Sequence, residues 1–93
     1  MTGSSAAPGL YLVIETFRPN CRDRVYERFE QKGRMLPAGL TVVDAWVTQD
    51  GTCCYQLMRT VDPSTFDRWV ERWSDLVDFE IVAVERSPTM GSG

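Results

Sequence analysis

The sequence predicts an α+β domain with the element order β-α-β-β-α-β. Three patterns in its 93 residues favour this class: β-rich apolar stretches, two stretches with apolar residues at helical spacing, and an Asp-Gly pair that suits a hairpin. With right-handed crossovers, this order gives a four-stranded antiparallel sheet with both helices on one face. We therefore expect a ferredoxin-like plait with the strand order 4-1-3-2.

The first half of the domain is predicted as strand, helix and strand. Residues 10–17 (LYLVIETF) form the first expected strand. Asn20 is a favourable N-cap for a helix that begins at Cys21, and Gly33 suits the C-terminal end of that helix. After a loop, the second strand is expected over residues 40–48.

A hairpin is predicted at the centre of the chain. Asp50 and Gly51 both tolerate positive φ, and they separate the second strand from a third strand over residues 52–60. Counting outward from this turn pairs the strands as Thr48–Cys53, Val47–Cys54, Trp46–Tyr55, Ala45–Gln56, Asp44–Leu57 and Val43–Met58.

The remaining elements are a second helix and a last strand. Asp62 and Pro63 open the helix as N-cap and first helical residue. The apolar stripe of this helix comprises Phe66, Trp69, Val70, Trp73 and Val77. The last strand is expected over residues 79–85. The folded domain thus covers residues 10–86, and the small, polar stretches 1–9 and 87–93 are expected to be disordered tails.

Composition narrows the classes of function. A net charge of −3 without a basic stripe predicts no nucleic-acid partner, and no apolar run approaches the roughly 20 residues of a membrane span. The N-terminal stretch shows no signal-peptide pattern, and three cysteines without C-x-x-C spacing indicate free thiols and a cytoplasmic protein. The chain has no histidine, which excludes His-dependent triads, His-ligated zinc and axial-His haem, so we expect no metal and no cofactor.

Both faces of the expected sheet are apolar, although two helices cover only one of them. We expect one set to face the helices: Leu12, Ile14, Val42, Trp46, Tyr55, Leu57, Phe79 and Ile81. We expect a second set on the uncovered face: Tyr11, Val13, Glu15, Phe17, Val43, Ala45, Val47, Cys54, Gln56, Met58, Val82 and Val84. Such a face exceeds the few hundred Å² of exposed apolar surface that monomers tolerate, so we expect a homodimer that packs sheet against sheet as an α+β barrel.

Glu15 and Gln56 are polar side chains within the second set, on strands that should be adjacent. Burial of a carboxyl group raises its pKa, which makes Glu15 the candidate catalytic acid or base. Alternatively, Glu15 meets an arginine or Gln56 and only fixes the register of the dimer. Arg34, in the loop after the first helix, either reaches an acid or an anionic ligand or lies exposed on the surface.

Two tryptophans are further candidates for ligand binding. Trp46 lies in the second strand, and Trp73 follows Trp69 by four residues on one helix face. Each is either the wall of an apolar pocket or an ordinary structural residue. Asp75 opposes the dipole of the second helix, and we expect it to pair with Arg72 or cap a final turn unless it has a functional role.

Four stretches carry a further signal: LYLVIETF, RFEQKGRMLPAGL, VVDAWVTQDGTCCYQLM and WVERWSDLVDFEIVAV. Their motif elements are Glu15, Gly33-Arg34-Met35, Trp46, Cys54-Tyr55-Gln56-Leu57-Met58 and the stretch from Trp69 to Phe79. Over nearly all of residues 10–85 the chain resembles an uncharacterised bacterial family, the domain of unknown function 3303. The acid that usually follows the Leu-Met pair in that family is Arg59 here.

The resemblance implies a stress-responsive protein with a dimeric α/β-barrel-like fold and no established activity. Broader relatives of that fold include cofactor-independent monooxygenases, small isomerases and haem-degrading enzymes. Such a fold-level analogy is weak evidence for any one activity. The absence of histidine argues against the haem branch.

Two hypotheses for function follow. In the first, the protein binds a small apolar or anionic molecule, with or without cofactor-independent chemistry, between the helices and the sheet or inside the dimer barrel. Glu15 is then the acid or base, Gln56 and Arg34 orient the ligand, and Trp46 or Trp73 forms an apolar wall. In the second, the protein is a non-catalytic structural or regulatory dimerisation module, and Glu15 and Gln56 are satisfied within the interface.

Overall fold

The computed structural model describes residues 7–88 and has the expected element order. The strands are β1 (Gly9–Phe17), β2 (Thr41–Val47), β3 (Cys53–Thr60) and β4 (Val77–Val84), and the helices are α1 (Arg22–Lys32) and α2 (Thr65–Glu71). Every strand pair is antiparallel, and the order β2-β3-β1-β4 is the expected order read from the other edge. The predicted ferredoxin-like plait is confirmed. Most of each expected tail, residues 1–6 and 89–93, lies outside the described residues.

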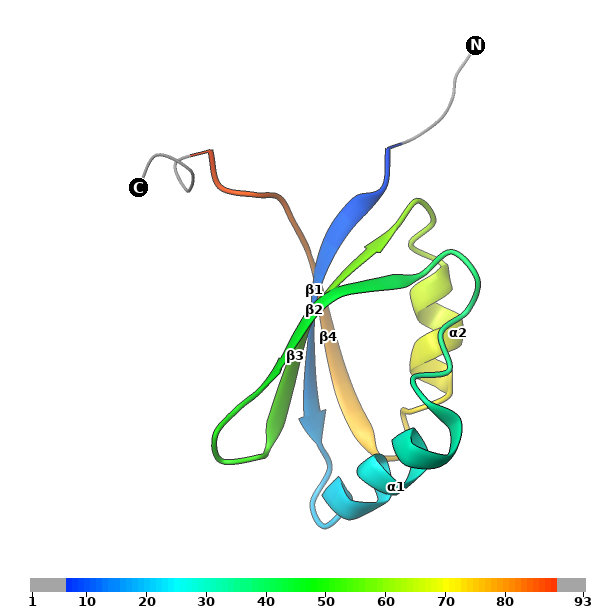
Figure 1. Ribbon diagram of the computed structural model, residues 1–93, viewed down its shortest axis with the longest axis vertical. Coiled ribbons are helices and arrows are strands. Elements are labelled where there is room, and N and C mark those ends of the chain that lie inside the picture. Colours follow the sequence, from blue (N-terminus) through cyan, green and yellow to red (C-terminus); the bar gives the residue numbers. More distant parts are fainter. Residues whose placement is uncertain (1–6, 89–93) are drawn as a thin grey trace.

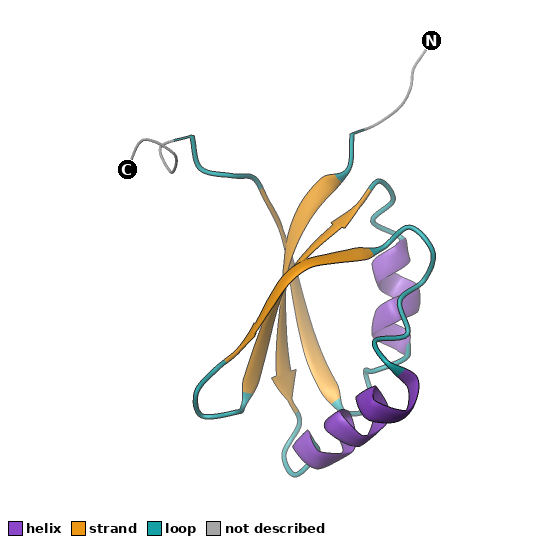
Figure 2. Cartoon of the chain, in the orientation of Figure 1, coloured by secondary structure: helices purple, strands orange, loops and turns teal. Residues whose placement is uncertain are grey.

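The fold has two layers, a twisted sheet and a pair of helices on one of its faces (Figures 1 and 2). Val13 in β1 and Met58 in β3 are fully buried beneath the helices and form the centre of the core with Trp69 and Leu76. In these views the other face of the sheet carries no helix. Neither described helix has the length and apolar character that a membrane crossing requires.

The faces of β1 and β3 are the reverse of those expected. Glu15 and Gln56 alternate with less buried positions and share the helix-facing side with Val13 and Met58. The uncovered face instead carries Leu12, Ile14, Trp46, Tyr55, Leu57, Val82 and Val84. Within β1 and β3 the alternation separates two sets of residues correctly, but because both sets are apolar it does not show which set the helices cover.

In β4 the expected faces are correct, but their expected grouping with the faces of β1 is wrong. Phe79 and Ile81 face the helices as predicted, but they do so beside Glu15 and Val13, which are their cross-strand partners. Val82, which is 39% exposed, lies on the uncovered face with Leu12. Each face of the sheet therefore combines members of both expected sets.

A β-bulge at Val43 interrupts β2. The expected pairs hold from Asp44–Leu57 to Val47–Cys54, but Met58 pairs with Val42 rather than with Val43. Val42 consequently packs against the core, whereas Val43 is 44% exposed. The extra residue resets the alternation at the start of the strand, which counting from the hairpin could not reveal.

The hairpin uses one left-handed residue instead of two. Gly51 has a φ of 75°, whereas Asp50 is not among the residues with positive φ. The Asp50 carboxylate accepts hydrogen bonds from the Thr48 hydroxyl, the Thr52 hydroxyl and the Thr52 backbone N–H. These bonds lower the pKa of Asp50 to about 2, and they hold the loop in the conformation that closes the hairpin.

Both helices begin later than expected. Asn20 has a φ of 62°, so it lies outside α1 and Cys21 occupies the N-cap position. Gly33 ends α1 as predicted, with a φ of 66° and its N–H bonded to the carbonyl oxygen of Phe29.

At the start of α2, Asp62 closes a tight turn instead of capping the helix directly. Its carboxylate accepts hydrogen bonds from the backbone N–H and the hydroxyl of Ser64, and its carbonyl oxygen accepts one from the Thr65 N–H. The helix proper runs from Thr65 to Glu71. Two residues expected in its stripe lie beyond it, Trp73 in the turn after α2 and Val77 as the first residue of β4.

Candidate functional site

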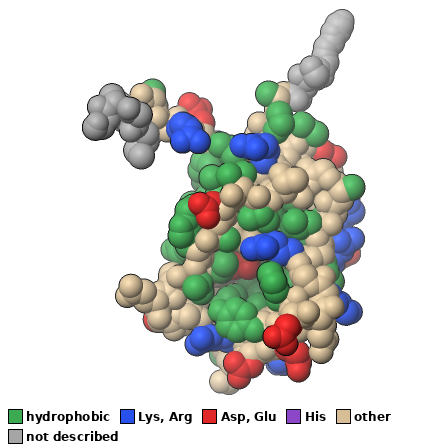
Figure 3. All heavy atoms as spheres, viewed as in Figure 1, with side chains coloured by type: hydrophobic (Ala, Val, Ile, Leu, Met, Phe, Trp, Pro, Cys, Tyr) green, Lys and Arg blue, Asp and Glu red, His purple; other side chains and the backbone are tan. Residues whose placement is uncertain are grey.

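A pocket of about 290 Å³ lies between the helical layer and the sheet. Figure 3 shows hydrophobic side chains around a hollow on this side of the molecule, with acidic and basic side chains beside them. The structure places all five residues singled out by the sequence around this one pocket: Glu15, Arg34, Trp46, Gln56 and Trp73. Of the two locations considered, the pocket lies in the one between the helices and the sheet.

A directional chain of hydrogen bonds joins the three polar residues of the pocket. Arg34 Nε donates to Gln56 Oε1 at 3.0 Å, and Gln56 Nε2 donates to Glu15 Oε2. Because Arg34 is only a donor, the amide oxygen of Gln56 must face it, which turns the amide nitrogen toward Glu15. Glu15 and Gln56 are only 7% and 5% exposed, so this arrangement satisfies polar groups that water does not reach freely.

Burial sets the protonation behaviour of Glu15. Desolvation raises its pKa to about 7, although the hydrogen bond from Gln56 and the positive charge of Arg34 act in the opposite direction. Both protonation states are therefore accessible near neutral pH, which is the property that a general acid or base requires.

Cys54 lines the same pocket and has a thiol with a raised pKa. Burial and the neighbouring charge of Glu15 raise the pKa of its thiol to about 11, so the thiol stays protonated. Within the described part of the chain, no group of three or more His, Cys, Asp or Glu residues could hold a metal ion.

Two indoles fix the backbone of Arg34. Trp69 Nε1 and Trp73 Nε1 donate hydrogen bonds to the Arg34 carbonyl oxygen at 3.0 and 2.9 Å. Met35, the next residue, has a φ of 57°, and the Arg34 guanidinium lies over the Phe29 ring at 5.2 Å. The loop after α1 is thus held by α2 and by the turn that follows it, and Arg34 is directed toward Gln56.

The three tryptophans of the chain have different roles in the pocket wall. Trp69 and Trp73 are 2% and 6% exposed, so they belong to the core as well as to the pocket. Trp46 pairs with Tyr55 and so belongs to the uncovered face by register. It is 52% exposed, and because β2 is an edge strand, it also contributes to the pocket lining at the rim. Trp69 was not among the residues expected to bind a ligand. Its signal was the indole N–H, which needs an acceptor once it is buried.

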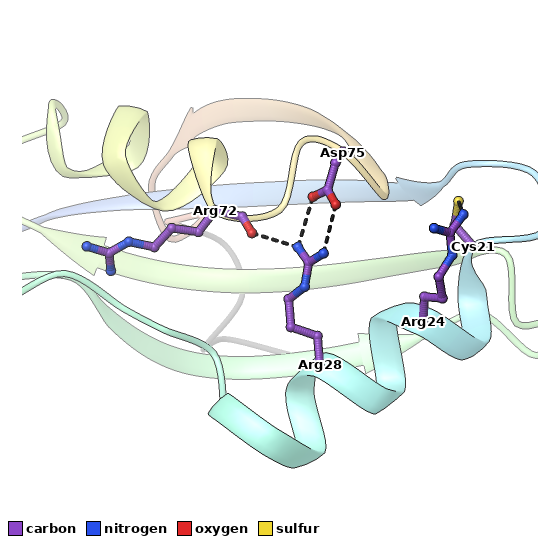
Figure 4. A network of polar contacts seen from close by, with 5 residues as sticks. All are labelled: Cys21, Arg24, Arg28, Arg72 and Asp75. Carbon is purple, nitrogen blue, oxygen red and sulfur yellow. Dashed lines mark hydrogen bonds and ion pairs between the residues drawn. The ribbon is translucent and has the colours of Figure 1, made fainter.

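An ion pair beside the pocket fixes the position of α1 (Figure 4). Arg28 binds Asp75 through both terminal nitrogens, at 2.8 and 2.7 Å, and Arg28 Nη1 also donates to the Arg72 carbonyl oxygen. The hydrogen bond from Arg28 lowers the pKa of Asp75. Asp75 therefore pairs with α1, and the expected pair with the Arg72 side chain does not form. The Arg28 guanidinium also lies 5.4 Å from the centre of the Trp73 ring.

The fold is a ferredoxin-like plait with a pocket between its helices and its sheet, and three solved structures share this fold. PA3566 from Pseudomonas aeruginosa is 16% identical, with a TM-score of 0.58 over 90% of this chain and 99% of that one. An uncharacterised NIPSNAP-like domain protein from Burkholderia xenovorans is also 16% identical, with a TM-score of 0.58 over 90% and 89% of the two chains. A protein assigned as an antibiotic biosynthesis monooxygenase from Bacteroides thetaiotaomicron is 16% identical, with a TM-score of 0.55 over 85% of this chain and 89% of that one.

The chain belongs to the family described as domain of unknown function (DUF3303), whose model matches residues 9–92. The family resemblance expected from the sequence is confirmed. No protein with a curated description matches the chain in sequence. At 16% identity, the solved structures show a shared fold and nothing about ligands.

Proposed function

We propose that this protein binds a small, largely apolar molecule in the pocket between the helices and the sheet, and that Glu15 exchanges a proton with it. The observation that carries this proposal is the position of Glu15. A carboxyl group that is 7% exposed lines an apolar pocket and has a pKa of about 7. Titratable groups with strongly shifted pKa values in concave sites are typical of binding and catalytic centres.

The pocket has the size and lining of a small-ligand site. Its volume of about 290 Å³ suits a molecule of one or two fused rings, and aromatic side chains from both helices and the sheet surround it. A few convergent polar groups within an apolar wall are the usual means of orienting such a ligand.

The residues present support proton transfer without a cofactor. Glu15 would give or take the proton, while Gln56 fixes the orientation of its carboxyl group and Arg34 fixes Gln56. One structural neighbour is assigned as a monooxygenase, which supports small-molecule chemistry on this fold by analogy alone.

Titration with 2-naphthamide, a neutral bicyclic probe, tests the binding site. We expect the indole N–H signals of Trp69 and Trp73 in a ¹H–¹⁵N correlation spectrum to shift, because their rings line the pocket. Ala45→Leu fills the pocket from β2 and should abolish these shifts, whereas Ala83→Leu, at an exposed position outside the lining, should leave them unchanged. Shifts that are confined to signals of the uncovered face, or that survive Ala45→Leu, would contradict the proposal.

A second proposal concerns the uncovered face of the sheet, which we infer to be covered by a second copy of the chain. Leu12, Ile14, Tyr55 and Leu57 form a continuous apolar surface on adjacent strands, and Val82 extends it onto β4. A two-fold axis through such a surface pairs like with like. Glu15 and Gln56 face the helices, so this interface would form without them.

A further inference from the structure

We propose that the ligand of this pocket is a small apolar molecule with a single carboxylate, which binds between Arg34 and a protonated Glu15, so that one proton is taken up with the ligand. This inference rests on the proposed function and names the chemical class of its ligand. It follows from the hydrogen-bonding capacity that the pocket leaves unused.

Arg34 brings a positive charge to the pocket that no carboxylate contacts. The ion pairs of the described residues are Arg18–Asp78 and Arg28–Asp75, and neither includes Arg34. Its Nε donates to Gln56, while its terminal nitrogens donate to none of the residues in the described chain. A partly buried guanidinium with unused donors matches the paired oxygens of a carboxylate.

Glu15 offers the pocket a donor when it is protonated. Gln56 donates a hydrogen bond to Glu15 Oε2, while Glu15 Oε1 accepts no hydrogen bond from residues 7–88. An ionised Glu15 would repel an anionic ligand, whereas a neutral Glu15 can donate its proton from Oε1. Protonation of Glu15 therefore converts a repulsive contact into a hydrogen bond.

The other groups that face Glu15 do not alter its charge balance. Tyr26 of α1, the indole of Trp69 in α2 and the indole of Trp73 in the turn after α2 line the pocket with Glu15, and β3 contributes the protonated thiol of Cys54. From β4, the cross-strand neighbour is Phe79. Among the residues that line the pocket, Arg34 and Glu15 are those with charged side chains at neutral pH.

The charge of the pocket then selects a monoanion. With Glu15 protonated, the lining carries one positive charge, that of Arg34. One carboxylate neutralises this charge and accepts hydrogen bonds from both the Arg34 guanidinium and the Glu15 carboxyl group. A neutral ligand would leave the Arg34 charge without a partner in an apolar site, and a dianion would leave an excess negative charge. Because the pKa of Glu15 is about 7, this residue must gain a proton on binding at pH 8 and is already largely protonated at pH 6.

Calorimetric titration with 2-naphthoate, compared with its neutral isostere 2-naphthamide, tests the inference. At pH 6 we expect 2-naphthoate to bind at least about tenfold more tightly than the amide, because only the carboxylate pairs with Arg34. Its affinity should fall about tenfold between pH 6 and pH 8 as Glu15 ionises. At pH 8, titrations in buffers with different ionisation enthalpies should show about one proton taken up per ligand, and at pH 6 about none.

Two variants and two matched controls separate the contributions. Glu15→Gln keeps a donor without a titrating group, so the affinity for 2-naphthoate should become independent of pH and proton uptake should vanish. Arg34→Met should lower the affinity for 2-naphthoate about tenfold and leave the affinity for 2-naphthamide unchanged. Glu80→Gln and Arg59→Met change exposed sheet positions outside the pocket lining. Neither variant should alter the affinity for 2-naphthoate or for 2-naphthamide.

The outcomes distinguish the inference from the function on which it rests. Equal binding of the amide and the carboxylate, or carboxylate binding at pH 8 without proton uptake, would overturn the inference while the pocket remains a ligand site. If neither probe binds the folded protein, the proposed function itself is overturned, and the inference with it.

Discussion

The carboxyl group of Glu15 binds its proton more tightly in the folded protein than in the unfolded chain. Its pKa is about 7 in the fold against an ordinary value of 4.5. Between these two values the folded state holds more protons than the unfolded state, so the free energy of unfolding decreases as the pH rises. Above about pH 7 the loss is complete, and it amounts to roughly 3 kcal/mol for a shift of this size.

Glu15→Gln removes this cost of ionisation. We expect the variant to match the original protein near pH 4 and to exceed it in stability by about 3 kcal/mol at pH 8, because glutamine has no charge to desolvate. Urea unfolding from pH 4 to pH 8 measures the difference between the two proteins, in which the contributions of all other titrating groups cancel. Parallel stability curves would show that Glu15 has an ordinary pKa.

At the scale of single residues, the sequence identified the polar members of the site but not their connections. Glu15 and Gln56 stood out because they interrupt apolar strands. The bond between them depends on a diagonal relation, since Glu15 lies opposite Cys54 and Gln56 lies opposite Val13. Arg34 reaches Gln56 because the indoles of Trp69 and Trp73 hold its backbone. These residues lie 35 and 39 positions further along the chain.

Among the elements, α1 depends most on polar contacts for its position. Val25 is its one buried residue, so hydrophobic burial alone anchors it weakly. The Arg28–Asp75 pair ties α1 to the turn after α2 (Figure 4). The Arg28 guanidinium also lies over the Trp73 ring. A bidentate pair of this kind is more effective than a single contact between flexible side chains.

A double-mutant cycle with Arg28→Ala and Asp75→Ala measures the strength of this tie. We expect a coupling energy of about 0.5–1 kcal/mol in thermal or urea unfolding, reduced in 1 M salt because the pair is partly exposed. The Arg18–Asp78 pair is the control, since its side chains are 47% and 66% exposed and meet at a single contact. Its coupling energy should be close to zero. Equal coupling in both cycles would contradict the proposed role of Arg28.

The order and type of the elements followed from local sequence, but several of their ends did not. Gly33 ends α1 as predicted because a left-handed residue there suits glycine. Asn20 instead takes a left-handed conformation, and Val77 lies in a strand although its spacing suits the stripe of α2. In both cases the tertiary context decides between two local options that the sequence leaves nearly equal.

For the molecule as a whole, the sequence revealed two apolar faces without showing which one the helices cover. Val13 and Leu12 are neighbours of similar size and polarity, yet the first is fully buried and the second lies on the uncovered face. Nothing in the strand pattern separates them. The choice depends on where the crossover connections place the helices, and hence on the whole topology.

The uncovered face leads to a prediction about mass in solution. We expect light scattering after size-exclusion chromatography to give about twice the 10.6 kDa of one chain. Leu12→Glu, which places a charge at the centre of this face, should give a folded monomer, because a buried unpaired carboxylate opposes association. Val61→Glu adds the same charge at an exposed loop position and should leave the mass unchanged. A monomeric original protein at micromolar concentration would contradict the proposal.

The bulge in β2 bears on how this chain tolerates changes in length. Val43 has no partner in the register with β3, while Val42 and Asp44 on either side of it pair with consecutive residues, Met58 and Leu57. Loss of Val43 alone would therefore leave every remaining pair and both faces of the sheet as they are. Loss of any residue from Asp44 to Val47 would turn part of the strand over. Val43 is thus the point at which β2 can become shorter during evolution while the pocket wall is preserved.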